Sequence, residues 1–121
     1  MGRKPRRASR PDDVLSLLGL ARRAGEAISG IAASREALRQ NRVHLLLIAE
    51  DAAEGQVSKL RGIMEGRKVP FRIVGDRKGL GAAIGESPRS AVAVTSASFA
   101  DQLLKRIPGP SGHGSMREHR R

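Results

Sequence analysis

The chain has 121 residues, 39% of them hydrophobic and only 2% aromatic, with a formal charge of +11 and no cysteine. This length and composition predict one globular domain with an aliphatic core. They exclude disulfides and thiolate metal sites, as suits a reducing cytoplasm. The positive charge is typical of a protein with a polyanion partner, because each neutralised phosphate releases counterions.

The charge is concentrated at the two ends of the chain. Residues 1–10 carry five bases and no acid, and residues 108–121 carry three bases and one acid, whereas residues 11–107 hold 15 bases and 11 acids. Both ends lack an apolar period, so we expect a disordered basic tail at 1–10, a flexible basic tail at 108–121 and one domain between them. A solubilising excess of charge is the alternative to a polyanion partner. No stretch approaches the ~20 apolar residues of a membrane span, so we expect no membrane contact.

Helix and strand patterns alternate through the domain. The first predicted helix is capped by Asp12 or Asp13 and ended by Gly25, and a very short strand follows at 27–29. Gly30 opens a second helix at about 31–40, which Asn41 ends, and a buried strand follows at 43–49. The remaining elements are a helix at about 54–66, a strand at 71–74, a short helix at 77–84, a strand at 91–95 and a helix capped by Ser96 or Ser98. This alternation predicts an α/β fold whose sheet is covered by helices on both faces.

Residues that carry catalysis are scarce. The three histidines have no ligand-like spacing to carboxylates, and no serine stands in a G-x-S-x-G elbow. We therefore expect no enzyme, no cofactor, no metal and no small-molecule substrate. Glu50 and Asp51 follow a buried strand and could together bind Mg²⁺, but we prefer an interpretation in which they cap the next helix.

The glycine-rich stretch Gly79–Gly85 differs from a dinucleotide-binding motif. Its third glycine comes one residue late for G-x-G-x-x-G, and the stretch lies inside a predicted helix. Close packing of a short helix on the sheet explains its small residues better.

The turn Ser29-Gly30-Ile31 indicates an anion site. A glycine at a helix N-terminus leaves backbone N–H groups accessible at the positive end of the helix dipole. Arg35 and Arg39 are four residues apart and could extend a phosphate contact along the same helix. An ordinary glycine turn with a solvated basic face explains these residues equally well.

The aromatic residues indicate which nucleic acids are excluded. Proteins that bind single strands stack bases on exposed aromatic side chains, whereas Phe71 and Phe99 both fall at inward positions. Recognition of a structured RNA through phosphates, shape and helix termini fits better, although composition alone does not separate RNA from DNA.

Four stretches resemble the kink-turn RNA-binding ribosomal protein superfamily, in particular its bacterial YlxQ/YbxF branch. They are Leu17–Gly25 (LLGLARRAG), Ile28–Gly30 (ISG), Leu46–Ala52 (LLIAEDA) and Leu80–Gly85 (LGAAIG). Their order and spacing match over about residues 13–107.

The resemblance implies a three-layer α/β/α sandwich around a four-stranded mixed sheet, and binding to kink-turns, which are sharply bent RNA helices with a short bulge beside G·A pairs. In the family the N-terminus of the second helix enters the major groove at those pairs, and the loop before the last strand covers the bulge. The RNA-binding residues expected here are Ser29, Gly30, Ile31, Ala32, Ala33, Arg35, Glu36, Arg39, Glu50, Glu86, Ser87, Pro88 and Arg89.

The sequence departs from the family pattern where bases are read. Members that bind kink-turns well carry an Asn-Glu pair after the glycine and a Lys further on, whereas this chain has Ala32, Ala33 and Glu36. Kink-turn specificity therefore does not follow from the resemblance alone. We expect a monomeric, non-catalytic, ribosome- or translation-associated RNA-binding protein. The rival hypothesis is a protein-interaction module that kept the fold and lost specific RNA recognition.

Overall fold

A computed structural model describes residues 11–108. Within this range the elements are α1 (Pro11–Arg23), β1 (Ala27–Ser29), α2 (Ile31–Arg39), β2 (Leu45–Ile48), α3 (Glu54–Arg67), β3 (Phe71–Ile73), α4 (Arg77–Ala83), β4 (Ala91–Val94) and α5 (Ala97–Arg106). Their order and type agree with the prediction. The two expected tails lie outside the described residues, apart from Pro108, and stay predictions.

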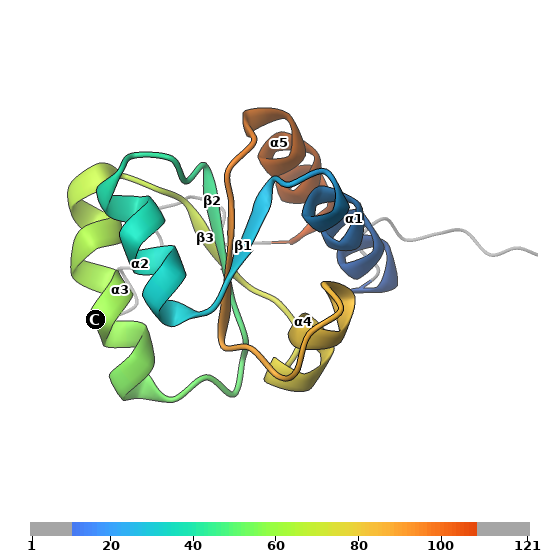
Figure 1. The fold of residues 1–121 in the computed structure, drawn as a ribbon, viewed down its shortest axis with the longest axis horizontal. Coiled ribbons are helices and arrows are strands. Elements are labelled where there is room, and N and C mark those ends of the chain that lie inside the picture. Colours follow the sequence, from blue (N-terminus) through green and yellow to red (C-terminus); the bar gives the residue numbers. More distant parts are fainter. Residues whose placement is uncertain (1–10, 109–121) are drawn as a thin grey trace, which may run out of the picture.

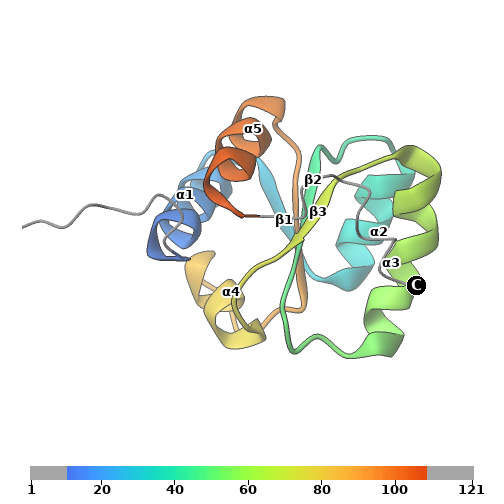
Figure 2. The same cartoon turned by 180° about the vertical axis from the view of Figure 1, so that it is seen from behind.

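The sheet has four strands in the order β1-β4-β2-β3. β4 is antiparallel to both β1 and β2, and β3 is parallel to β2. Figure 1 shows α2 and α3 on one face of the sheet and α1, α4 and α5 on the other. In Figure 2, which shows the opposite side, α1 again lies between α4 and α5. The predicted α/β/α sandwich with a mixed sheet is confirmed.

The core lies in two layers because side chains alternate between the faces of a strand. Leu45 and Leu47 of β2 pack with α1, α4 and α5, whereas Leu46 and Ile48 pack with α2 and α3. All four side chains are at most 2% exposed. The apolar run is therefore buried on both faces, as predicted, while His44 before it is exposed.

Helix capping differs from the prediction at α1. Asp12 and Asp13 both lie inside the helix, which the structure describes from Pro11 onward, so neither is its N-cap. At α5 the predicted cap is found, since Ser96 Oγ accepts a hydrogen bond from Phe99 N–H at 3.2 Å.

α4 packs on the sheet, as predicted, because Leu80, Ala83 and Ile84 lie in the same core layer as Val92 and Val94 of β4. Its glycine Gly81 also lies against the loop that follows the helix. A Cβ on Gly81 would collide with the carbonyl oxygen of Ser87 and lie 2.9 Å from the Cα of Pro88. A Cβ on Gly19 in α1 would lie 2.9 Å from the carbonyl oxygen of Ala83. These glycines let α4 fit closely between α1 and the segment before β4.

Candidate nucleic-acid interface

Three loops and the start of α2 meet at one edge of the sheet, which we call the α2 edge (residues 29–33, 49–51, 75–77 and 86–90). Gly30 N–H donates to the carbonyl oxygen of Ala91 at 2.9 Å, and Ala49 N–H donates to that of Ser90 at 2.9 Å. In Figure 1 this is the lower edge. The antiparallel pairing of β4 with β1 and β2 thus brings together both segments that the sequence indicated.

The N-terminus of α2 is open because no side chain caps it. The N-cap residue Gly30 has φ 96° and ψ 157°, a conformation that side-chain-bearing residues rarely adopt. Ala32 and Ala33 in the first turn are exposed, and Ile31 packs partly against the core. The first N–H groups of the helix therefore have no side-chain acceptor and are accessible to an anion.

One face of α2 is turned to the sheet and the other carries charge. Ser34 and Leu38 are completely buried. Arg35 is half-buried, whereas Glu36 and Arg39 are exposed. Glu36 Oε2 accepts a hydrogen bond of 3.2 Å from the Gln40 side chain, which does not cancel its charge.

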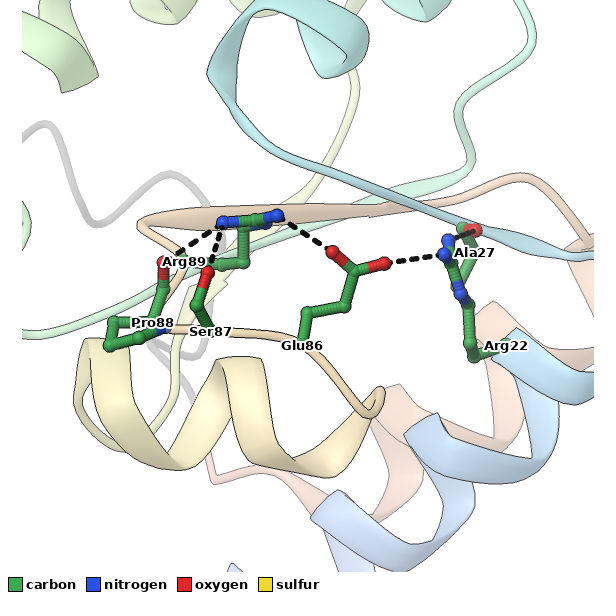
Figure 3. A network of polar contacts seen from close by, with 6 residues as sticks. All are labelled: Arg22, Ala27, Glu86, Ser87, Pro88 and Arg89. Atoms are coloured by element: carbon green, nitrogen blue, oxygen red, sulfur yellow. Dashed lines mark hydrogen bonds and ion pairs between the residues drawn. The ribbon is translucent and has the colours of Figure 1, made fainter.

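Glu86 of the α2 edge joins Arg89 of the same edge to Arg22 of α1 (Figure 3). Its Oε2 lies 2.6 Å from Arg22 Nη2, and its Oε1 lies 2.7 Å from Arg89 Nη2. Arg89 Nη1 also donates to Ser87 Oγ at 3.0 Å, and Arg22 Nη1 to the carbonyl oxygen of Ala27 at 3.3 Å. Glu86 thus positions both guanidinium groups, and each of its oxygens has an internal partner.

Asp51 does not cap the next helix, contrary to the interpretation preferred above. The N-cap of α3 is Ala53, without a side-chain hydrogen bond. Instead Asp51 Oδ1 accepts a hydrogen bond of 2.7 Å from the backbone N–H of Arg77, the first residue of α4. This contact arises because β2 and β3 are parallel neighbours, so the loops that follow them meet at the same edge.

The predicted residues divide by exposure. Those that are exposed are Ala32, Ala33, Glu36, Arg39, Glu50, Ser87 and Pro88, and those that are half-buried are Ser29, Gly30, Ile31, Arg35, Glu86 and Arg89. Arg39 lies at the far end of α2, away from the α2 edge. Local sequence pattern did not identify Arg22 and Arg77 as site residues, because their partners are 64 and 26 positions away in the chain. The family resemblance could have identified Arg22, because this residue stands inside the matching stretch LLGLARRAG.

The described residues of the α2 edge do not form a candidate metal site. Among residues 11–108 there is no group of three or more His, Cys, Asp or Glu side chains placed to hold a metal ion. Burial lowers the pKa of the Arg72 guanidinium, but Arg72 lies on β3, outside the α2 edge.

Residues 12–104 match the ribosomal protein L7Ae/L30e/S12e/Gadd45 family, and the chain belongs to that family. This membership confirms the resemblance found in the sequence and supports the expectation of a non-catalytic protein.

Particular relatives agree with the family assignment. Over 88 residues the chain is 39% identical to the RNA-binding protein YlxQ of Bacillus subtilis, which covers 73% of this chain and 88% of that protein. A solved protein of unknown function from Bacillus halodurans has a TM-score of 0.74 at 34% identity, covering 78% of this chain and 95% of the other. The Giardia lamblia 15.5 kD RNA-binding protein has a TM-score of 0.66 at 18% identity, covering 78% and 84%, and supports the fold alone.

Within residues 11–108 no helix has the length and apolar character that crossing a membrane requires.

Proposed function

We propose that this protein binds structured RNA at the α2 edge, with phosphate oxygens at the N-terminus of α2 and beside Arg89. The observation that carries the proposal is the meeting of an uncapped helix N-terminus with the segment 86–90 at one edge. Backbone N–H groups at a helix start favour anions, and an arginine held close by adds a charge-assisted donor. The name of the Bacillus subtilis relative, an RNA-binding protein, supports RNA as the partner.

Recognition in this proposal rests on the backbone and shape of the RNA. Ala32 and Ala33 are exposed but have no side-chain donor or acceptor, so they cannot read base edges. A kink-turn offers the bent backbone that the α2 edge can follow, and we propose it as the preferred RNA shape. We further propose that the protein is a monomer and that it works in the cytoplasm in association with the ribosome or translation.

A protein-interaction role is the second candidate, and one observation favours it. Both arginines of the α2 edge already have acidic partners, since Glu86 binds Arg89 and Asp51 binds Arg77. Such pairing lowers the attraction to phosphate that these side chains would otherwise exert. A comparison of RNA affinities distinguishes the two roles.

The test obstructs the helix start without changing charge. Gly30 is unsuitable, because its φ of +96° would strain any side chain added there. Ala32→Leu places a bulky group over the N–H groups of the first turn, and leucine suits a helix. We expect kink-turn affinity to fall about ten- to hundredfold, the equivalent of one charge-assisted hydrogen bond.

The matched control is Ala97→Leu, at an exposed alanine in the first turn of α5 near the opposite edge of the sheet. Both variants should keep the melting temperature of the parent protein. Titration of a kink-turn RNA and of a straight duplex of equal length gives the affinities. Equal affinity of Ala32→Leu, Ala97→Leu and the parent for the kink-turn would remove the α2 edge from RNA binding and favour the protein-interaction role.

A further inference from the structure

A second charged surface lies at the opposite edge of the sheet, where α2 and α3 end. We call Arg39, Arg42, Arg67 and Lys68 the distal cluster. Arg39 and Arg67 stand in the last turns of the two helices, and Arg42 and Lys68 lie in the turns that lead into β2 and β3. In Figure 1 these helix ends are at the top, opposite the α2 edge.

Hydrogen bonds between the two helix ends hold the distal cluster together. Arg67 Nε donates to Asn41 Oδ1 at 3.0 Å, and Arg67 Nη2 donates to the carbonyl oxygen of Arg39 at 3.4 Å. Asn41 and Lys68 both have left-handed backbone conformations, with φ 60° and 56°. The bonds from Arg67 bring the ends of the two helices together, and all four cationic side chains are exposed.

Within residues 11–108 no carboxylate forms an ion pair with a residue of the distal cluster. The arginines in ion pairs within this range are Arg22, Arg61, Arg77 and Arg89. None of the four cluster residues is among them. The bonding partners of Arg67 and Arg42 are neutral oxygens, including Gln40 Oε1 at 3.1 Å from Arg42 Nη1. The distal cluster therefore offers more uncompensated positive charge to a partner than the α2 edge does.

A side-chain path connects the two surfaces. Arg35 and Arg39 lie one turn apart on the outer part of α2, which begins at the α2 edge and ends at the distal cluster. α2 has nine residues, so the path along it is about 13 Å long. A nucleic-acid backbone that leaves the α2 edge along α2 would meet four cations at its end.

We propose that the distal cluster is a second contact site for the phosphate backbone of the same RNA. It takes the part of a bound helix that extends beyond the segment seated on the α2 edge. This inference rests on the proposed binding of RNA, and the contacts it adds are independent of sequence because phosphates carry no base information. The distal cluster thus makes affinity depend on the length of the RNA helix next to the bend.

The experiment removes two charges that make no contact between elements. Arg42→Gln with Lys68→Gln is compared with Lys59→Gln with Lys105→Gln, which lowers the net charge equally on exposed parts of α3 and α5. Each protein is titrated with two kink-turn RNAs, one with short flanking helices and one with a flanking helix extended by ten base pairs. Titrations at several salt concentrations give the slope of log K against log salt.

We expect the cluster variant to bind the extended RNA at least tenfold more weakly at 0.1 M salt, with a slope smaller by about 1.5, because each lost phosphate contact accounts for about 0.7–0.9. Its affinity for the short RNA should match the control. Cations near helix C-termini also stabilise the helices, so melting temperatures are measured as well. A loss of affinity equal to that of the control, or equal for both RNAs, would overturn the second contact site.

The result separates this inference from the proposed function. If Ala32→Leu leaves binding intact while the cluster variant loses it for the extended RNA, the α2 edge fails and the distal cluster stands. If Ala32→Leu weakens binding and the cluster variant binds both RNAs as the control does, the α2 edge stands as an RNA site and the distal cluster fails. Unchanged affinity and slope for both RNAs in the cluster variant would show that the distal cluster does not bind RNA.

Discussion

At the scale of single residues, the fold requires Gly30 at the start of α2, whereas Glu36 in the same helix disfavours the binding of phosphate. Gly30 takes a positive φ, so glycine is needed for the turn whether or not an anion binds there. Glu36 is exposed one turn into α2, where a carboxylate would repel a phosphate at the start of the helix. The first residue serves the fold, and the second opposes the proposed function.

Glu36→Lys is therefore expected to tighten binding to kink-turn RNA. Replacing a negative by a positive charge near a phosphate removes one repulsion and adds one attraction, together up to about 2 kcal/mol at the protein surface. The affinity should rise about three- to thirtyfold at low salt. Asp101→Lys, an equal change of charge at an exposed position of α5, is the control. If both variants gain affinity equally, net charge alone is responsible.

At the scale of elements, the site depends on how closely α4 approaches the segment before β4. Gly81 faces the backbone of Ser87 and Pro88, and Glu86 N–H donates to the carbonyl oxygen of Gly81 at 2.8 Å. This contact determines the position of the loop, and through Glu86 the position of Arg22 and Arg89. Packing within the protein therefore orients Arg89, which we propose to face RNA.

Two glycine-to-alanine substitutions test this packing, and their effects should have opposite signs. In Gly81→Ala the new methyl group collides with backbone that cannot simply rotate away, which should destabilise the fold by about 1–3 kcal/mol. In Gly62→Ala, inside α3, the methyl group meets open space, so the higher helix propensity should stabilise the fold by about 0.5–1 kcal/mol. Urea unfolding of both variants measures the difference, and a neutral Gly81→Ala would contradict the contact.

At the scale of the whole molecule, the central strand β2 joins two cores that face opposite helix layers. Leu46 is fully buried on the α2 and α3 side, and Leu47 is fully buried on the other. Because the described residues bury an apolar core on both faces of the sheet, the domain should be stable without RNA.

Leu46→Ala should cost about 2–5 kcal/mol of unfolding free energy through the cavity that it leaves. Leu20→Ala is the control, because Leu20 is 48% exposed and its loss should change stability by no more than about 0.5 kcal/mol. Thermal melts of both variants are compared with and without RNA. A parent chain that melts cooperatively only in the presence of RNA would contradict an independently folded domain.

Much of this protein follows from local sequence pattern. The spacing of apolar residues indicated the first, third and last helices, the run from Val43 to Ala49 identified the buried strand, and Gly30 marked the start of α2. Such features follow from neighbours in the chain, whose spacing decides which face of an element is apolar. Tertiary structure alone decided which distant residues meet. Strand order and register brought Glu86 to Arg22 and Asp51 to Arg77, and helix packing joined Arg67 to Asn41. The net charge at each edge depends on these contacts, because they form between residues that are far apart in the sequence and cannot be predicted from local spacing.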